Sequence, residues 1–211
     1  MTDFHPVDRS NWSREPYFSH YFTQVPCTYS MTVKIDITAL RQSGQKLYPA
    51  MLYCLSKLVN AHAEFRMTVN ENGQLGFYDI MHPCYTIFQK EMETFTNLWT
   101  PYSSDYQIFL KAYEKDLKEY GKVQTFMAKP NLPSNHFPVS MIPWETFESF
   151  HLNLQKGYDY LTPIFTMGRF YQEHDSWMLP LSIQVHHAVC DGFHVCRFVR
   201  ELRELVNHVF S

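Results

Sequence analysis

The stretch from residue 179 to residue 210 limits the fold more than any other part of this chain. LPLSIQVHH (179–187) alternates apolar and polar side chains, which predicts a strand with every second side chain on the same face. FHVCRFVRELRELVNHVF (193–210) repeats its apolar residues at helical spacing, and Asp191-Gly192 supplies a turn signal between the two segments. An amphipathic helix that follows a half-buried strand this closely must pack on a sheet, so we expect an α/β fold.

The rest of the chain interleaves further strand and helix patterns in an irregular order. A hairpin is predicted over 66–79, with the turn NENG (70–73) carried by Asn72-Gly73. The other predicted strands are 28–37, 84–89, 137–142 and 165–171, and the other predicted helices are 47–62 and 104–121. This order predicts a mixed sheet with helices packed on it. Since the sequence contains no internal repeat and no Gly/Ser linker, we expect one domain over residues 1–211.

Charge and hydropathy argue against several classes of partner. The formal net charge is −3 and no basic run is present, so nucleic acid is not an expected partner. No apolar run reaches the ~18 residues that a membrane span needs, and the polar N-terminus lacks the layout of a secretion signal. The five cysteines include no CxxC pair, which favours reduced thiols in the cytoplasm over a disulfide framework.

The nine residues HHAVCDGFH (186–194) allow three interpretations. In the first, both histidines are ordinary strand residues and Asp191 only caps the following helix. In the second, a catalytic base stands at the end of the strand, because an imidazole exchanges a proton near neutral pH and His187 falls on the apolar row. In the third, zinc is bound, although the spacing matches no common zinc motif; its ligands would be His187, Cys190, His194 and Cys196.

QVHHAVCDGFH (184–194) resembles the signature of the chloramphenicol acetyltransferases, which are CoA-dependent trimeric enzymes of antibiotic resistance. Dihydrolipoamide acyltransferase catalytic domains share a version of HHxxxDG, but the N-terminal and central motifs favour the antibiotic enzymes. The further similar segments are DRSNWSREPYF (8–18), CTYSMTVKIDITAL (27–40), NAHAEFRM (60–67), HPCYTIF (82–88), TFTNLW (94–99), VSMIPW (139–144), FESFHLN (147–153) and PIFTMG (163–168). The resemblance implies a two-layer α/β sandwich whose mixed sheet continues across the subunits of a homotrimer, with active sites at the subunit interfaces.

The resemblance also implies the reaction, which is acetyl transfer from acetyl-CoA to the 3-hydroxyl of chloramphenicol in a ternary complex, without an acyl-enzyme and without a permanently bound cofactor or metal. His187 matches the general base, and removal of such a base costs about 10²–10⁴-fold in rate. Ser140 matches the hydroxyl that donates a hydrogen bond to the tetrahedral oxyanion, a contact worth about 3 kcal/mol.

Three residues match positions that support the family's active site. Asp191 would pair with Arg14, so that the carboxylate fixes the turn instead of acting on the imidazole. Loss of one partner from such a buried pair costs about 3–5 kcal/mol. Thr166 would help to hold the site through hydroxyl or water contacts. By the same reading, His186, His194, Cys190 and Cys196 are structural.

Apolar and aromatic walls suit an aryl ring and a dichloroacetyl group, and eight positions match the family's acceptor pocket. These are Tyr21, Val25, Cys27, Phe95, Phe126, Phe150, Leu152 and Leu154. Acetyl-CoA would contact Ser140, Thr166 and Phe170.

Three residues depart from the family pattern. Phe170 stands where a tyrosine is common, and His20 and Asn97 stand where apolar or small residues are expected. Two alternative functions stay open at this point, namely an acyltransferase with another acceptor such as a lipoyl thiol, and a non-catalytic or zinc-binding module on the same fold.

Overall fold

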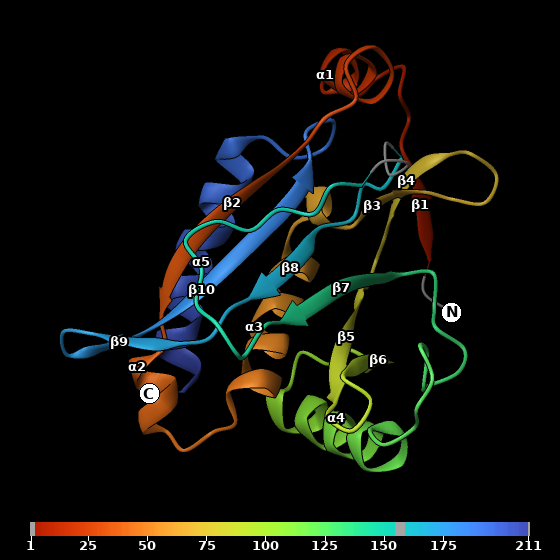
Figure 1. The fold of residues 1–211 in the computed structure, drawn as a ribbon. Helices are drawn as coiled ribbons and strands as arrows, with labels where there is room; N and C mark the ends of the chain where they lie inside the picture. Colours follow the sequence, from red (N-terminus) through yellow and green to blue (C-terminus); the bar gives the residue numbers. More distant parts are fainter. Residues whose placement is uncertain (1–2, 155–158, 211) are drawn as a thin grey trace.

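The computed structural model describes residues 3–154 and 159–210 (Figure 1). The strands are β1 (Phe4–Pro6), β2 (Thr28–Asp36), β3 (Met67–Val69), β4 (Leu75–Tyr78), β5 (His82–Gln89), β6 (Thr94–Trp99), β7 (His136–Met141), β8 (Ile164–Met167), β9 (Tyr171–Glu173) and β10 (Ser176–His186). The α-helices are α1 (Glu15–Ser19), α2 (Thr38–Gln42), α3 (Leu47–Ala61), α4 (Tyr106–Tyr120) and α5 (Gly192–Val209). A π-helix, η1 (His20–Gln24), continues α1, and a 3₁₀ turn, η2 (Ala63–Phe65), follows α3.

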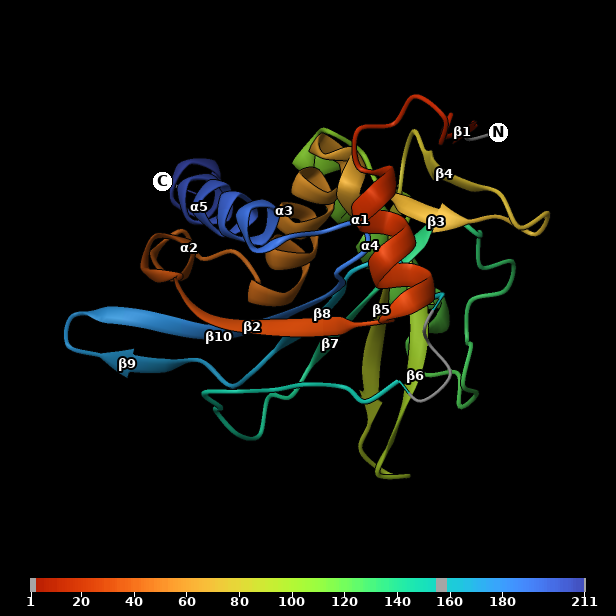
Figure 2. The ribbon, with the colours of Figure 1, turned by 90° about the horizontal axis from the view of Figure 1, so that it is seen from above.

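One seven-stranded sheet organises most of the chain, in the order β2-β10-β8-β7-β5-β6 with β9 paired to β10. Its β5–β7 and β7–β8 pairs are parallel, whereas the others are antiparallel, so the prediction of a mixed sheet is confirmed. Helices α2, α3 and α5 lie together on one face of this sheet (Figure 2). The fold is therefore a sheet covered by a helical layer, as predicted.

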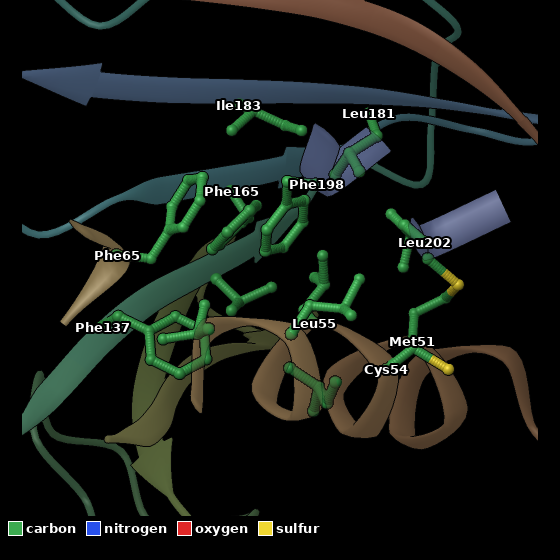
Figure 3. Packing of buried hydrophobic residues seen from close by; sticks show 14 of the residues in the cluster. Met51, Cys54, Leu55, Phe65, Phe137, Phe165, Leu181, Ile183, Phe198 and Leu202 are labelled. Carbon is green, nitrogen blue, oxygen red and sulfur yellow. The ribbon is translucent and has the colours of Figure 1, made fainter. Parts of the chain in front are cut away.

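Facing side chains of three neighbouring strands build the centre of the core. Val139, Phe165 and Ile183 lie opposite one another in register and are all buried. Phe198 of α5 stacks on Phe165 with ring centroids 5.4 Å apart, and Leu55 of α3 packs in the same cluster (Figure 3). Because side chains alternate along a strand, the neighbouring residues on these strands point to the other face.

A second layer of chain covers that other face. Ser182 donates a hydrogen bond from its hydroxyl to the carbonyl of Phe150 (2.8 Å). The side-chain amide of Gln184 accepts from the N–H of Leu152 and donates to its carbonyl, both at 2.9 Å. These bonds fix Phe150 and Leu152 against the polar row of β10, and they explain why buried strand positions carry Ser and Gln.

The predicted strands and helices differ from the structure mainly in short elements. The hairpin forms as predicted, with Gly73 at φ +75°, but it joins β1 in a separate three-stranded sheet. The predicted strand 165–171 divides into β8 and β9. No strand or helix was predicted for β1, β6, α1 or α2; of these, β1, α1 and α2 have only three to five residues, which is too short to show a periodic pattern.

We predict that Phe198→Ala lowers the free energy of unfolding by about 3–5 kcal/mol, because it leaves a cavity against Phe65 and Phe165. Chemical denaturation measures the change. Ile108→Ala on α4 is the control, since 60% of that side chain is exposed and a change within about 0.5 kcal/mol is expected. Equal losses in the two variants would contradict the proposed position of the core.

Candidate functional site

His187 lies in the turn that follows β10, with its ring held between two tyrosines. Its backbone N–H donates to the carbonyl of Cys27 (2.9 Å), which extends the pairing of β10 with the chain before β2 by one residue. The imidazole stacks flat on Tyr21, with centroids 3.9 Å apart and an interplanar angle of 5°, and meets Tyr29 edge-on at 5.5 Å. The side chain remains 30% exposed, so one part of the ring is held and another reaches solvent.

Arg14, just before α1, binds this turn through four donated hydrogen bonds. Its Nε donates to the carbonyl of Ala188 (2.9 Å) and its Nη2 to the carbonyl of His187 (3.0 Å). Nη1 and Nη2 also donate to the two carboxylate oxygens of Asp191 at 2.6 and 2.7 Å. Hydrogen bonding to Arg14 lowers the pKa of Asp191, and Asp191 in turn raises the pKa of Arg14. The N-terminal segment and the strand–helix turn are thus joined by a charged, bidentate contact.

Asp191 makes two further contacts at the start of α5. Its Oδ1 lies 3.3 Å from Nδ1 of His187, which is within ion-pair distance when the imidazole is protonated. Its backbone N–H donates to Nδ1 of His194 (2.9 Å). Burial lowers the pKa of His194, in keeping with a neutral ring that accepts at this atom. The carboxylate therefore contacts both the arginine and the imidazole, whereas the sequence led us to expect contact with the arginine alone.

A cavity of about 550 Å³ opens on the face of the sheet opposite to the helices. Ser140 of β7 and Thr166 of β8 lie side by side on its floor, since the two residues are paired in register. Five of the residues predicted for the site line it: Phe95, Ser140, Phe150, Leu152 and Thr166. Its remaining walls are mostly apolar and aromatic, which suits a small ligand of mixed polarity.

Three aromatic residues that line this cavity were not predicted from the sequence. Tyr48 of α3 donates its hydroxyl to the carbonyl of Thr86 at 3.1 Å. Phe88 and Trp144 meet edge to face, with centroids 4.5 Å apart, and are 42% and 56% exposed. Tyr48 lies within the apolar pattern of its helix, so the sequence did not mark it as a cavity residue. For Phe88 and Trp144, the local sequence does not distinguish a cavity wall from the hydrophobic core.

Phe170 lies in a neighbouring cavity of about 600 Å³, and Pro143 lines both. The guanidinium of Arg41 lies 4.7 Å from the Phe170 ring and 5.2 Å from the Trp177 ring. Arg169 adds a second cation to the lining. The lining of the first cavity is mostly apolar around Ser140, whereas the lining of the second is aromatic and cationic around Phe170.

The structure does not bring His187 and Ser140 of one chain together. Ser140 pairs with Thr166, and Thr166 pairs with Ser182, so Ser140 lies two strands away from β10. His187 is five residues beyond Ser182, which puts the two Cα atoms roughly 20 Å apart. By strand alternation their side chains also start on opposite faces of the sheet. The predicted catalytic pair cannot act within a single chain.

Five of the eight predicted pocket residues lie outside the cavity. Val25, 51% exposed, lies just before Cys27 on the His187 side of the molecule. Phe126 is 69% exposed and contacts the Phe95 ring, with centroids 6.0 Å apart. Leu154 is half-buried at the end of the described segment. Tyr21 and Cys27 contact His187 instead, so the predicted pocket residues divide between the two halves of the site.

The candidate zinc ligands do not form a cluster. Across residues 3–154 and 159–210, no group of three or more His, Cys, Asp and Glu side chains is arranged to hold a metal ion. Cys190 is buried and its thiol points to the carbonyl of Glu64, whereas Cys196 is exposed. Burial raises the pKa of Cys190, which disfavours a thiolate there.

Comparisons with known proteins agree with one another. The family model described as chloramphenicol acetyltransferase matches residues 2–203. A chloramphenicol acetyltransferase of Vibrio anguillarum is 61% identical over 97% of this chain and 94% of its own length. One from Clostridium perfringens is 59% identical over 97% and 99%. A solved chloramphenicol acetyltransferase structure has a TM-score of 0.85 at 20% identity and covers 97% of this chain and 100% of its own.

We predict that Asp191→Asn lowers the free energy of unfolding by about 1–3 kcal/mol at pH 7, because Arg14 loses its counter-ion. This is less than a fully buried pair would lose, since 37% of the Asp191 side chain is exposed. A carboxyl with a lowered folded-state pKa adds stability above its unfolded pKa of about 3.9, and that stability is lost as pH falls through the folded value.

Denaturation of both proteins from pH 7 to pH 3 measures this effect. The gap between wild type and variant should stay constant down to about pH 5 and narrow below about pH 4. Glu173→Gln, which breaks an exposed pair with Lys34, is the control and should have little effect. If the difference in unfolding free energy between wild type and variant grows as the pH falls, the proposed role of the Arg14–Asp191 ion pair is wrong.

Proposed function

The chain belongs to the chloramphenicol acetyltransferase family, and from this premise we propose that it transfers the acetyl group of acetyl-CoA to the 3-hydroxyl of chloramphenicol. The observation that carries the proposal is 61% identity over nearly the whole chain with a protein of that name. The cavity beside Ser140 supports it, because its volume and apolar walls suit the aryl and dichloroacetyl groups. The product would be an acetylated antibiotic and free CoA, which gives resistance.

In the proposed mechanism His187 is the general base. Its ring takes the proton from the acceptor hydroxyl while the hydroxyl oxygen attacks the thioester carbonyl. Stacking on Tyr21 fixes the plane of the His187 ring, so the nitrogen lone pair is already oriented when the acceptor hydroxyl binds. Arg14 and Asp191 support the turn without entering the reaction.

Ser140 would stabilise the tetrahedral oxyanion by donating its hydroxyl hydrogen. Thr166, its register partner, would hold a water or hydroxyl contact at the same place. The intermediate then expels the thiolate of CoA, which takes up the proton held by His187. No covalent acyl-enzyme is needed, so Ser140 acts as a donor and not as a nucleophile.

We further propose a homotrimer in which His187 of one subunit meets Ser140 of the next. The separation of these residues within one chain supports this arrangement, since neither half is complete alone. Exposed apolar side chains beside both halves would be covered on assembly, among them Tyr17 and Val25 near His187 and Phe88, Phe95 and Trp144 near Ser140. The long edge strand β2 offers a place where the sheet could continue into the next subunit.

The second cavity would take the nucleotide end of acetyl-CoA. Arg41 and Arg169 supply positive charge for phosphate groups, and Phe170 and Trp177 supply flat surfaces for a base. The pantetheine arm would then run past Pro143 toward Ser140.

We also propose one domain over residues 1–211 and a cytoplasmic location. All five cysteines are free thiols, and the described residues include no helix able to cross a membrane.

A thiol-release assay tests the proposed reaction. Purified protein is mixed with acetyl-CoA and chloramphenicol, and free CoA is followed with a chromogenic disulfide. Release that requires chloramphenicol and survives a chelator supports the proposal. Release only with a dihydrolipoyl acceptor, or none at all, would overturn it.

We predict that His187→Ala lowers kcat by about 10²–10⁴-fold or more, and that Ser140→Ala lowers it by about 10²–10³-fold. Both variants should retain the wild-type melting temperature, because neither side chain fills the core. Steady-state kinetics measures the effect. A His187→Ala protein that acetylates the drug at the wild-type rate would exclude this mechanism.

We predict that the two inactive variants restore activity when they are unfolded together and refolded as mixed trimers. Random assembly leaves roughly a quarter of the interfaces with an intact His187 facing an intact Ser140. Mixing without unfolding is the control and should give no activity. If the co-refolded variants show no acetyltransferase activity while wild type treated in the same way regains full activity, the hypothesis of a site shared between subunits is wrong.

A further inference from the structure

We propose that Asn97 is a positioning residue for the acceptor, acting through Phe126. The inference rests on the proposed function, and it goes beyond it by giving a task to a side chain that departs from the family pattern. The acceptor class concerned is an aryl-bearing primary alcohol. The task is to hold the backbone of Phe126, whose ring lies outside the cavity and contacts Phe95 in the cavity wall.

Phe126 combines an exposed side chain with a firmly bound backbone. Its ring is 69% exposed and touches only Phe95 among the aromatic contacts of the described residues. Its carbonyl accepts two hydrogen bonds, one from the backbone N–H of Asn97 (2.9 Å) and one from the Asn97 side-chain amide (2.8 Å). An aromatic ring that is kept in water on a fixed backbone is suited to contact something outside its own chain.

Asn97 also holds the residues that follow Phe126. The N–H of Ala128 donates to the carbonyl of Asn97 (3.1 Å), and a parallel bridge pairs Asn97 with Met127. The segment therefore runs beside β6 like a short extra strand. Asn97 therefore binds residues 126–128 through both its own backbone and its own side chain.

A buried ion pair anchors the end of the same segment. Lys129 donates to Asp116 of α4 (2.8 Å) and to the carbonyl of Trp99 (2.9 Å), and its ammonium lies 4.0 Å from the centroid of the Trp99 ring. Asp116 also accepts from the hydroxyl of Thr100 (2.8 Å). With this end fixed, the Phe126 backbone is held by the backbone N–H and the side-chain amide of Asn97, and the preceding carbonyl of Thr125 accepts from the hydroxyl of Thr96.

The position of Asn97 separates its effect from the donor side and from the chemical step. Alternation along β6 puts Asn97 on the same face as Phe95, whose ring lines the cavity. Phe170, by contrast, lines the neighbouring cavity. Loosening Phe126 should therefore weaken binding of the acceptor's aryl end, with no change in the affinity for acetyl-CoA or in kcat.

Kinetics of Asn97→Ala tests the proposal. We expect KM for chloramphenicol to rise about three- to ten-fold, the size of one hydrogen bond, with kcat and the KM for acetyl-CoA unchanged. Asn97→Asp is a second variant of the same shape that cannot donate to the carbonyl, and it should raise KM at least as much. Gln89→Ala is the matched control, because Gln89 binds the carbonyl of Gly121 farther up the same segment (2.9 Å). It should leave all three constants unchanged.

A double-variant cycle with Phe126→Ala separates positioning from direct contact. If Asn97 acts through Phe126, the double variant has the KM of Phe126→Ala alone. Additive effects would mean that Asn97 touches the acceptor itself, and would overturn the proposal, as would an unchanged KM in Asn97→Ala. The wild-type assay decides the proposed function separately: without chloramphenicol-dependent turnover in wild type, that function fails first and this inference falls with it.

Discussion

The guanidinium of Arg14 joins three parts of the chain that meet at His187. It binds the carbonyls of His187 and Ala188 and both carboxylate oxygens of Asp191, so a single planar group fixes the turn between β10 and α5. It also ties this turn to α1 and to η1, which carries Tyr21 onto the imidazole. Placement of the ring thus depends on a contact between residues more than 170 positions apart in the sequence.

The central sheet separates the two halves of the candidate site. Its helix-covered face holds the core row of Val139, Phe165 and Ile183, and its other face carries Ser140 and Thr166. His187 lies beyond the end of β10, away from both of these residues. One chain therefore offers an imidazole at one place and a cavity at another. In the proposed homotrimer, each interface would supply the imidazole from one subunit and the cavity from the next.

The sequence predicts those features whose patterns are long and regular. β10, α5, α3 and α4 were predicted within a few residues, because apolar periodicity and the residues that start or end helices mark them clearly. The adjacency of Ser140 and Thr166 could not come from periodicity, since strand register is set by tertiary pairing. The aromatic contacts of Tyr48 and Trp144 were missed for a related reason: an aromatic residue in a core and one in a cavity wall give the same local pattern.

The three residues that depart from the expected family pattern, His20, Asn97 and Phe170, each contact a nearby side chain or backbone group. Nδ1 of His20 hydrogen-bonds the Gln24 side chain within η1 (3.0 Å), and Phe170 lies under Arg41. Asn97 binds the Phe126 carbonyl. None of them touches Ser140 or the ring of His187 directly, although His20 also packs edge-on against Tyr21, which stacks on that ring. Phe170 lines the second cavity and Asn97 acts beside Phe95 of the first, so we expect these two residues to change affinity more than rate.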